Sequence, residues 1–180
     1  MWIGLLIIRL VIGVLFIGHG CQKLFGWFGG GGPEGTGEMF AKVGLRPGTM
    51  TAVIGGCAEA IGGTLMLMGF LVPLAAAAIA TVMAGAIIAV HRPNGLWNSK
   101  GGFEFPLLIA CVVIALAFTG AGRISIDSAG HLGLRGVVWG LVAVGLTILG
   151  ACSILVWRSV VSRMHEQPSQ PPARDRRNAA

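Results

Sequence analysis

The sequence predicts an all-α membrane protein, a polytopic bundle of transmembrane helices. Of its 180 residues, 54% are hydrophobic and only 11% are charged, and the mean hydropathy is +0.81. A soluble domain of this size leaves much of its surface in contact with water and could not cover so much apolar surface. The excess apolar surface must therefore face lipid, and the length suits one compact bundle.

Apolar segments long enough to cross a bilayer recur along the chain. A hydrocarbon core about 30 Å thick requires roughly 20 apolar residues in a helix. The segments that meet or approach this length are residues 1–18, 49–72, 74–90, 105–119 and 136–157. The first does not resemble a signal peptide, because no basic residue precedes it and no A-x-A-like site follows it. We expect a four-helix membrane domain, an additional transmembrane helix and a disordered basic tail, at residues 1–130, 131–158 and 159–180.

Residue types at the segment ends support these boundaries. Pro73 cannot continue a helix regularly and is expected to mark a tight turn after the second segment. His91 ends the third segment, and Pro106 suits the first turn of the fourth. Trp139 and Trp157 lie near the ends of the fifth segment, as in the aromatic belts at membrane surfaces.

The distribution of basic residues predicts the orientation. Five of the thirteen basic residues follow residue 157, and Lys and Arg are retained on the cytoplasmic side of membrane proteins. With this C-terminal tail inside and five spans, ten basic residues lie inside and two, Arg123 and Arg135, lie outside. The N-terminus is then outside, and the glycine-rich loops 19–48 and 91–102 are cytoplasmic. The basic residues retained on the cytoplasmic side of the membrane account for the net charge of +6, so no nucleic-acid partner is expected.

Two ionisable residues lie in the middle of apolar segments. Arg9 and Glu59 are the charges at that depth of the first two segments, where an unpaired charge costs about 2.5–3.5 kcal/mol. We therefore expect Arg9 and Glu59 to pair with each other. The pair could be a structural ion pair that pins two helices together. Alternatively, Glu59 could handle protons or hold a ligand, and the sequence leaves both readings open.

Further polar residues gather at the expected cytoplasmic ends of the helices. A rotation of about 100° per residue places Arg9 and Lys23 in one stripe of the first helix, with His19 at its edge. His91 ends the third span and Glu104 opens the fourth, at a matching depth. We expect these side chains to form a site for a small polar headgroup whose tail stays in lipid.

Other ligands are weighed at the same residues. His19 and His91, on different helices, could ligate a haem, but helix capping or exposure at the interface explains a histidine at a helix end equally well. No recognisable metal-ligand spacing is present, so no metal site is expected. The four cysteines include no C-x-x-C, which gives no support to a metal knuckle or a dithiol motif.

Several groups of residues, in order along the chain, resemble the DoxX family. They are Arg9-Leu10, Gly13, Phe16, His19-Gly20 and Lys23-Leu24-Phe25-Gly26; Glu59, Gly62-Gly63, Leu65, Leu67 and Gly69; His91, Gly95 and Trp97; Gly101-Gly102 and Glu104-Phe105; and Gly120, Gly122-Arg123, Ser125 and Asp127. The resemblance extends over roughly residues 8–127. The fifth apolar span and the basic tail depart from the family pattern.

The resemblance implies a four-helix domain of bacterial inner membranes. The family is named for its similarity to quinone-linked oxidoreductase subunits, including those that pass electrons from thiosulfate to quinone. Some members are associated with thiol and oxidative-stress systems, and many have no established activity. The family's polar positions match Arg9, His19, Lys23, Glu59, His91 and Glu104 of this sequence.

Residues and resemblance together favour a quinone-linked oxidoreductase component. The expected ligands of menaquinone or ubiquinone, near the cytoplasmic face, are Arg9, His19, Lys23 and His91. Glu59 or Glu104 would relay protons. Because a guanidinium beside Glu59 would keep that carboxylate ionised, Glu104 is the better candidate. A redox partner protein is expected, and whether the chain is catalytic by itself stays open.

The alternative is a non-catalytic scaffold or a small-solute carrier, in which the polar residues merely hold helices together. Gly136 and Gly140 form a GxxxG pair that could serve helix packing or a homo-oligomer face.

Overall fold

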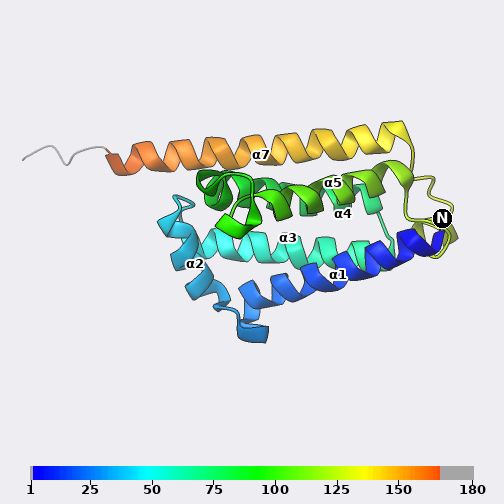
Figure 1. The fold of residues 1–180 in the computed structure, drawn as a ribbon, viewed down its shortest axis with the longest axis horizontal. Helices are drawn as coiled ribbons and strands as arrows, with labels where there is room; N and C mark the ends of the chain where they lie inside the picture. Colours follow the sequence, from blue (N-terminus) through cyan, green and yellow to red (C-terminus); the bar gives the residue numbers. More distant parts are fainter. Residues whose placement is uncertain (1, 167–180) are drawn as a thin grey trace, which may run out of the picture.

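The computed structural model describes residues 2–166 and confirms the all-α architecture. The long helices are α1 (Trp2–Phe25), α3 (Gly48–Met68), α4 (Val72–Ala86), α5 (Glu104–Thr119) and α7 (Val137–Glu166). Figure 1 shows them side by side, with α1 along one side of the bundle and α7 along the other. Packing follows the order α1 on α3, α3 on α4 and α4 on α5, while α7 contacts both α4 and α5.

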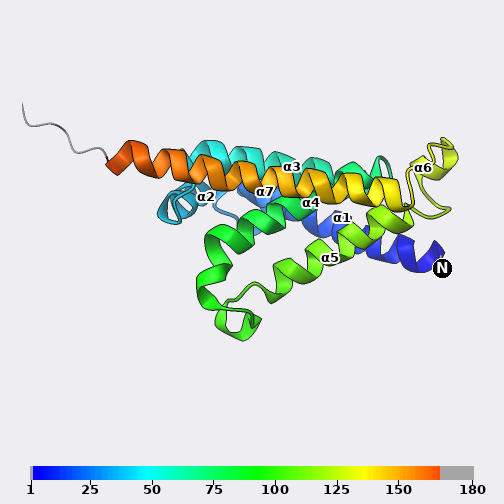
Figure 2. The ribbon, with the colours of Figure 1, turned by 90° about the horizontal axis from the view of Figure 1, so that it is seen from above.

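Short elements connect the long helices at the two ends of the bundle. They are the 3₁₀ turns η1 (Trp27–Gly29), η3 (Arg92–Asn94) and η4 (Asn98–Lys100), the helices α2 (Gly32–Lys42) and α6 (Ile126–Ala129), and the π-helical turn η2 (Ile87–His91). Figure 1 places α2 and the segment 87–103 at the end opposite the N-terminus. Figure 2 shows that the segment 87–103 projects sideways from the bundle between α4 and α5.

Within residues 2–166, four helical stretches are long and apolar enough to cross a membrane. They are Trp2–Phe25, Gly48–Met68, Val72–Asn94 and Val137–Met164. The fourth predicted span, α5, is apolar but has only 16 residues. Even so, its residues Val113, Leu116 and Ala117 are buried against α4 and the rest of the core. The chain is therefore a multi-pass membrane bundle of four long apolar helices and one shorter one.

The core lies around α4, which is the central helix. Ala75, Ala76, Ala77, Ile79 and Ala80 are all buried in it. Small side chains let neighbouring backbones approach closely, which is how helices gain contact area where lipid provides no hydrophobic driving force. The alanine-rich sequence of α4 thus allows three helices to pack around it.

Glycines allow the backbones of α1 and α3 to approach each other closely. A Cβ atom on Gly20 would lie 2.7 Å from the Cβ of Ala60, and a Cβ atom on Gly63 would lie 2.8 Å from the carbonyl oxygen of Gly13. Real side chains do not approach that closely. The two helices therefore depend on glycine at these positions for their contact.

Two predicted boundaries at the first loop are wrong. The first span was expected to end at residue 18, but α1 continues to Phe25 and carries Lys23 within the helix. The region 19–48 was expected to be a loop, yet α2 occupies much of it. The glycine-rich composition hid α2, whose Gly37 packs directly on the backbone of Thr49 at the start of α3.

The turn between α3 and α4 also differs from the prediction. The second span ends at Met68 rather than residue 72, because Gly69 takes a left-handed conformation with φ 64° and closes the helix. The amide of Phe70 then donates to the carbonyl oxygen of Leu65, a Schellman-type ending. Pro73 lies in the first turn of α4, where its missing amide proton is not needed, and does not itself mark the turn.

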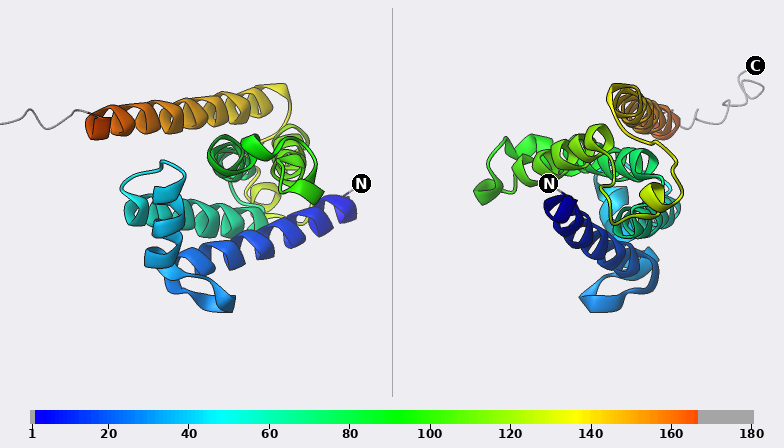
Figure 3. Two further views of the ribbon diagram at one scale, coloured as in Figure 1. Left: turned by 60° about the vertical axis from the view of Figure 1, so that its left-hand side comes forward. Right: turned by 90° about the vertical axis from the view of Figure 1, so that its right-hand side faces the viewer.

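The last helix is longer than predicted. α7 continues to Glu166, so the tail expected to be disordered from residue 159 begins as helix; residues 167–180 lie outside the described residues. Gly140 of α7 packs on the ring of Phe118 in α5, and Gly150 packs on Thr81 in α4. Figure 3 shows α7 applied to one side of the other helices. Gly140 therefore serves packing within the chain.

Candidate functional site

Glu59 is the acidic residue in the middle of a membrane span. Its side chain is only 3% exposed. Gly63, on one side of it, packs on α1, and Gly62, on the other, packs on Ile79 of α4. Residues three and four positions apart share a helix face. Glu59 therefore faces the interior of the bundle, between α1 and α4.

Lys23 is the partner of Glu59. Its Nζ donates to Oε2 of Glu59, and this is the one ion pair among the described side chains. The Lys23 side chain is 19% exposed, so the pair is accessible from the lysine end. Gly56 makes room for it, since a Cβ atom there would lie 3.1 Å from the Lys23 Cβ. The expected pairing of Glu59 with Arg9 is wrong.

Arg9 instead caps the end of α3. It is 1% exposed, and its guanidinium donates to four backbone carbonyls. Nε donates to Met66 at 3.1 Å and Nη2 to Leu67 at 3.2 Å, both in the last turn of α3. Nη1 donates to Ile124 at 2.9 Å and to Ala121. A cation favours the negative end of a helix dipole, so Arg9 stabilises the α3 C-terminus.

Asp127 completes the same cluster from the other side of the turn. Its carboxylate accepts from the amides of Leu71 at 2.8 Å and Val72 at 3.1 Å, at the start of α4. Its own amide donates to Gly69 at 2.9 Å. An anion at a helix N-terminus satisfies free amides and the dipole together. Asp127 belongs to the family pattern, but its role could not be predicted from the sequence, because its partners lie more than fifty residues earlier.

His19 lies on α1 one turn before Lys23 and is exposed. Its Nδ1 contacts Oε1 of Gln22 at 3.0 Å. An amide oxygen can only accept, so Nδ1 is the donor in this contact. The ring of Phe16 meets the imidazole edge-on at 6.2 Å between centroids.

His91 and Glu104 hold the loop between α4 and α5. His91 Nδ1 donates to the carbonyl oxygen of Gly101 at 2.8 Å, and Asn94 Nδ2 donates to the same oxygen at 3.2 Å. Glu104 Oε2 accepts from the amide of Asn98 at 2.9 Å. No described hydrogen bond or ion pair joins His91 or Glu104 to the Lys23 pair.

The structure thus divides the predicted site into three parts. Lys23 and Glu59 form a buried ion pair, with His19 one helical turn away on α1. His91 and Glu104 stabilise the loop between α4 and α5. Arg9 belongs to a cluster at the opposite end of the bundle. Among residues 2–166, no group of His, Cys, Asp and Glu side chains is arranged to hold a metal ion.

The fold and this site define a multi-pass helical membrane protein with an ion pair buried in its interior. The DoxX family model matches residues 4–92. A protein of Bacillus subtilis (strain 168) named "Putative oxidoreductase CatD" is 34% identical over 125 residues, which cover 69% of this chain and 85% of that protein. The chain belongs to the DoxX family.

The chain is also similar to a mycobacterial membrane protein. The "Uncharacterized membrane protein Rv3486" of Mycobacterium tuberculosis (strain ATCC 25618 / H37Rv) is 30% identical over 131 residues, covering 67% of this chain and 77% of that protein. No solved structure matches the chain.

Proposed function

We propose that the protein is a quinone-linked component of an oxidoreductase in the bacterial plasma membrane, with its C-terminus in the cytoplasm. The observation that carries the proposal is the Lys23–Glu59 ion pair, buried at Glu59 and accessible at Lys23. Ionisable groups inside membrane spans are rare and mark sites that move protons or hold ligands. The name of the Bacillus subtilis relative supports a redox function.

The residues around the pair suit a quinone headgroup. The ammonium of Lys23 has further N–H donors beside the one given to Glu59, and these can donate to a quinone carbonyl oxygen. His19 lies one helical turn away, with Phe16 against its ring. Such sites combine apolar and aromatic walls with a few placed polar groups. The isoprenoid tail of menaquinone or ubiquinone would stay in the lipid beside α1.

Proton delivery is the chain's own part in the proposed reaction. Bound quinone would supply the redox chemistry, taking two electrons from a redox partner protein and two protons on reduction to the quinol. Lys23 can give a proton from Nζ to an oxygen held beside it. The amine would then take up a proton again from water at its exposed end, beside the Glu59 carboxylate, and could deliver the second proton in the same way. The relay therefore falls to the Lys23–Glu59 pair, while His91 and Glu104 shape the adjoining loop.

The partner would belong to a thiol-linked or oxidative-stress redox system. This part of the proposal rests on the resemblance to DoxX members associated with such systems. The predicted orientation places the end of the bundle that carries His19 and Lys23 on the cytoplasmic side, where such a partner would dock.

The test measures quinone extracted per polypeptide from protein purified in mild detergent. Wild-type protein should carry near-stoichiometric quinone, and the His19→Ala and Lys23→Met/Glu59→Gln variants should lose most of it. His19 is exposed, so its variant should fold normally and separates loss of the site from loss of structure. Arg92 is exposed at the same end of the bundle, and Arg92→Gln should leave the amount of quinone per polypeptide unchanged.

Background quinone in all samples would overturn the proposal and favour the scaffold or carrier reading. His91→Ala belongs in the same series, because it tests the second histidine of the expected ligand set. An absorption spectrum of each sample tests the haem alternative: a Soret band lost in both histidine variants would replace quinone by haem as the ligand.

A further inference from the structure

A groove separate from the Lys23–Glu59 pair lies between α7 and the loop that joins α2 to α3. Its volume is about 620 Å³, and it is lined by Ala41, Lys42, Gly44, Arg46, Leu155, Arg158, Ser159, Val161 and Ser162. Three of these residues are basic and none is acidic. The two walls come from segments more than a hundred residues apart in the sequence.

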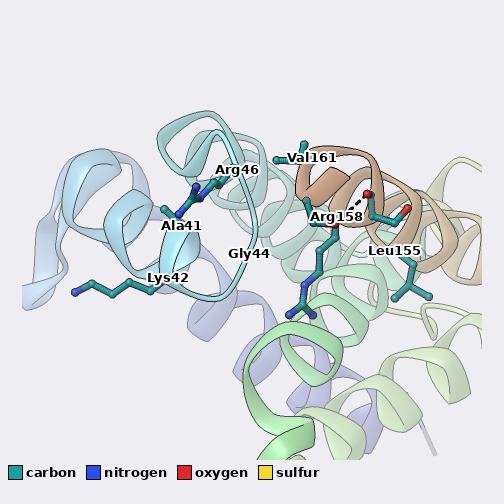
Figure 4. Close-up of a pocket in the computed structure, with 9 residues that line it drawn as sticks. Ala41, Lys42, Gly44, Arg46, Leu155, Arg158 and Val161 are labelled. Carbon is teal, nitrogen blue, oxygen red and sulfur yellow. Dashed lines mark hydrogen bonds between the residues drawn. The ribbon is translucent and has the colours of Figure 1, made fainter. Parts of the chain in front are cut away.

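Arg158 is the half-buried cation of the groove. Its Nη1 donates to the carbonyl oxygen of Ile88 at 3.3 Å, which anchors the guanidinium against η2, the turn that follows α4. The side chain passes close to Gly44, where a Cβ atom would lie 3.1 Å from Nε. Figure 4 shows Arg158 extending from α7 beside Gly44, with Arg46 on the opposite wall and Lys42 directed outward at the rim.

Among residues 2–164, no carboxylate neutralises the positive charge of the groove. Among the described side chains, no carboxylate forms an ion pair with Lys42, Arg46 or Arg158. The guanidinium of Arg158 offers more donors than the one used on Ile88. Arginine side chains recognise phosphate oxygens by two parallel hydrogen bonds.

The groove also lies at one end of two apolar helices, α3 and α7. The apolar run of α7 ends at Trp157, and α3 begins at Gly48, directly after the segment that carries Arg46. Trp157 Nε1 donates to the carbonyl oxygen of Arg46 at 2.7 Å, so the two ends are at one level. Tryptophan prefers the depth of the lipid headgroups. Leu155 gives the groove an apolar wall toward the bilayer.

We propose that this groove binds the phosphate headgroup of an anionic phospholipid of the cytoplasmic leaflet. Arg46 and Arg158 hold the phosphate, Lys42 adds charge at the rim, and the acyl chains follow the apolar surface of α7 past Leu155. Basic pockets between transmembrane helices bind anionic lipids by this combination of charge and position. The lipid would fill the space between α7 and the α2–α3 loop.

The test is the melting temperature of the full-length protein in detergent after addition of phosphatidylglycerol or phosphatidylcholine. A ligand that binds the folded state raises the melting temperature. Phosphatidylglycerol should stabilise the wild type, and its apparent affinity should fall by on the order of tenfold or more in Arg46→Gln/Arg158→Gln. The same variant melts as the wild type does in phosphatidylcholine if its fold is intact.

A matched control removes the same charge outside the groove. Arg92→Gln/Arg163→Gln changes two exposed arginines of the same end of the bundle and should bind phosphatidylglycerol as the wild type does. Equal stabilisation of wild type and groove variant, or equal losses in both double variants, would overturn the proposal. Inorganic phosphate that displaces the lipid at millimolar concentration would show a site for soluble anions and overturn the lipid assignment.

Discussion

Pairing of charges inside the bundle depends on the register between helices. On α1, Gly13 lies against Leu67 of α3 and Gly20 lies against Ala60. Glu59 is therefore level with the last third of α1, where Lys23 lies. Arg9 is level with the end of α3, and it finds backbone carbonyls there. Each charge takes the partner at its own depth.

The Lys23–Glu59 pair predicts an unequal response to substitution. Lys23→Met leaves the Glu59 carboxylate, 3% exposed, without a counter-charge and should lower the free energy of unfolding by about 3–5 kcal/mol. Glu59→Gln should have a smaller effect, since the long Lys23 side chain can direct its ammonium toward the membrane surface. Titration with SDS in mixed micelles measures both.

The double variant Lys23→Met/Glu59→Gln provides the control for that experiment. It removes both charges and should be more stable than Lys23→Met alone. Equal effects of the two single variants would contradict the unequal response. A double variant with the summed loss would show that the two charges do not depend on each other.

Helix packing in this protein rests on glycines at specific contacts. A Cβ atom on Gly20 of α1 would meet the backbone of Ala60, whereas a Cβ atom on Gly18 would meet nothing within 4 Å. The two positions lie in the same helix, two residues apart. Alanine favours the helix at both positions, but only at Gly20 does it also interfere with the close approach of α1 and α3.

Gly20→Ala and Gly18→Ala should therefore change stability in opposite directions. Gly18→Ala should be neutral or stabilise by up to about 1 kcal/mol, because alanine favours the helix. Gly20→Ala should destabilise by about 1–3 kcal/mol, since α1 and α3 must separate. Thermal unfolding of the two variants in one detergent compares them. Stabilisation by Gly20→Ala would contradict the packing of α1 on α3.

The turn from α3 to α4 gives a second matched pair. Gly69 and Gly133 both have φ 64°, but only at Gly69 would a Cβ atom overlap the Arg9 guanidinium and Ser125. Gly133→Ala should cost about 1–2 kcal/mol from backbone strain alone. Gly69→Ala should cost at least about twice as much, because it also displaces the guanidinium from its carbonyl partners. Equal losses of unfolding free energy would show that the Arg9 cluster tolerates the extra atom.

For the whole molecule, the orientation in the membrane decides which side each site faces. The ten-to-two distribution of basic residues predicts that the loop containing Ser99 is cytoplasmic. Ser99 is exposed in η4. In a variant without the native cysteines, Ser99→Cys should resist a membrane-impermeant thiol reagent in intact cells and react after lysis. Labelling of intact cells would invert the topology and place both proposed sites outside.

Much of the fold was predictable from sequence, and the wrong end of the first predicted span has an identifiable cause. The predicted spans end where apolar residues give way to polar ones. The first predicted segment therefore ends at residue 18, which makes Arg9 its midpoint. The helix instead continues to Phe25 through His19 and Lys23. Polar residues inside a membrane helix are tolerated where a partner or the interface satisfies them. The sequence does not state where those partners are.

The amino-acid sequence is sufficient to identify the chain as a multi-pass helical membrane protein of the DoxX family. The hydropathy of a segment is the sum over its own residues, so membrane spans can be predicted without knowing which helices pack against them. The three-dimensional structure was needed to show that Glu59 pairs with Lys23, that Arg9 and Asp127 cap α3 and α4, and that α7 closes a basic groove beside Arg46. These contacts depend on helix register and on where glycine permits close approach, which are properties of pairs of helices and not of any one segment.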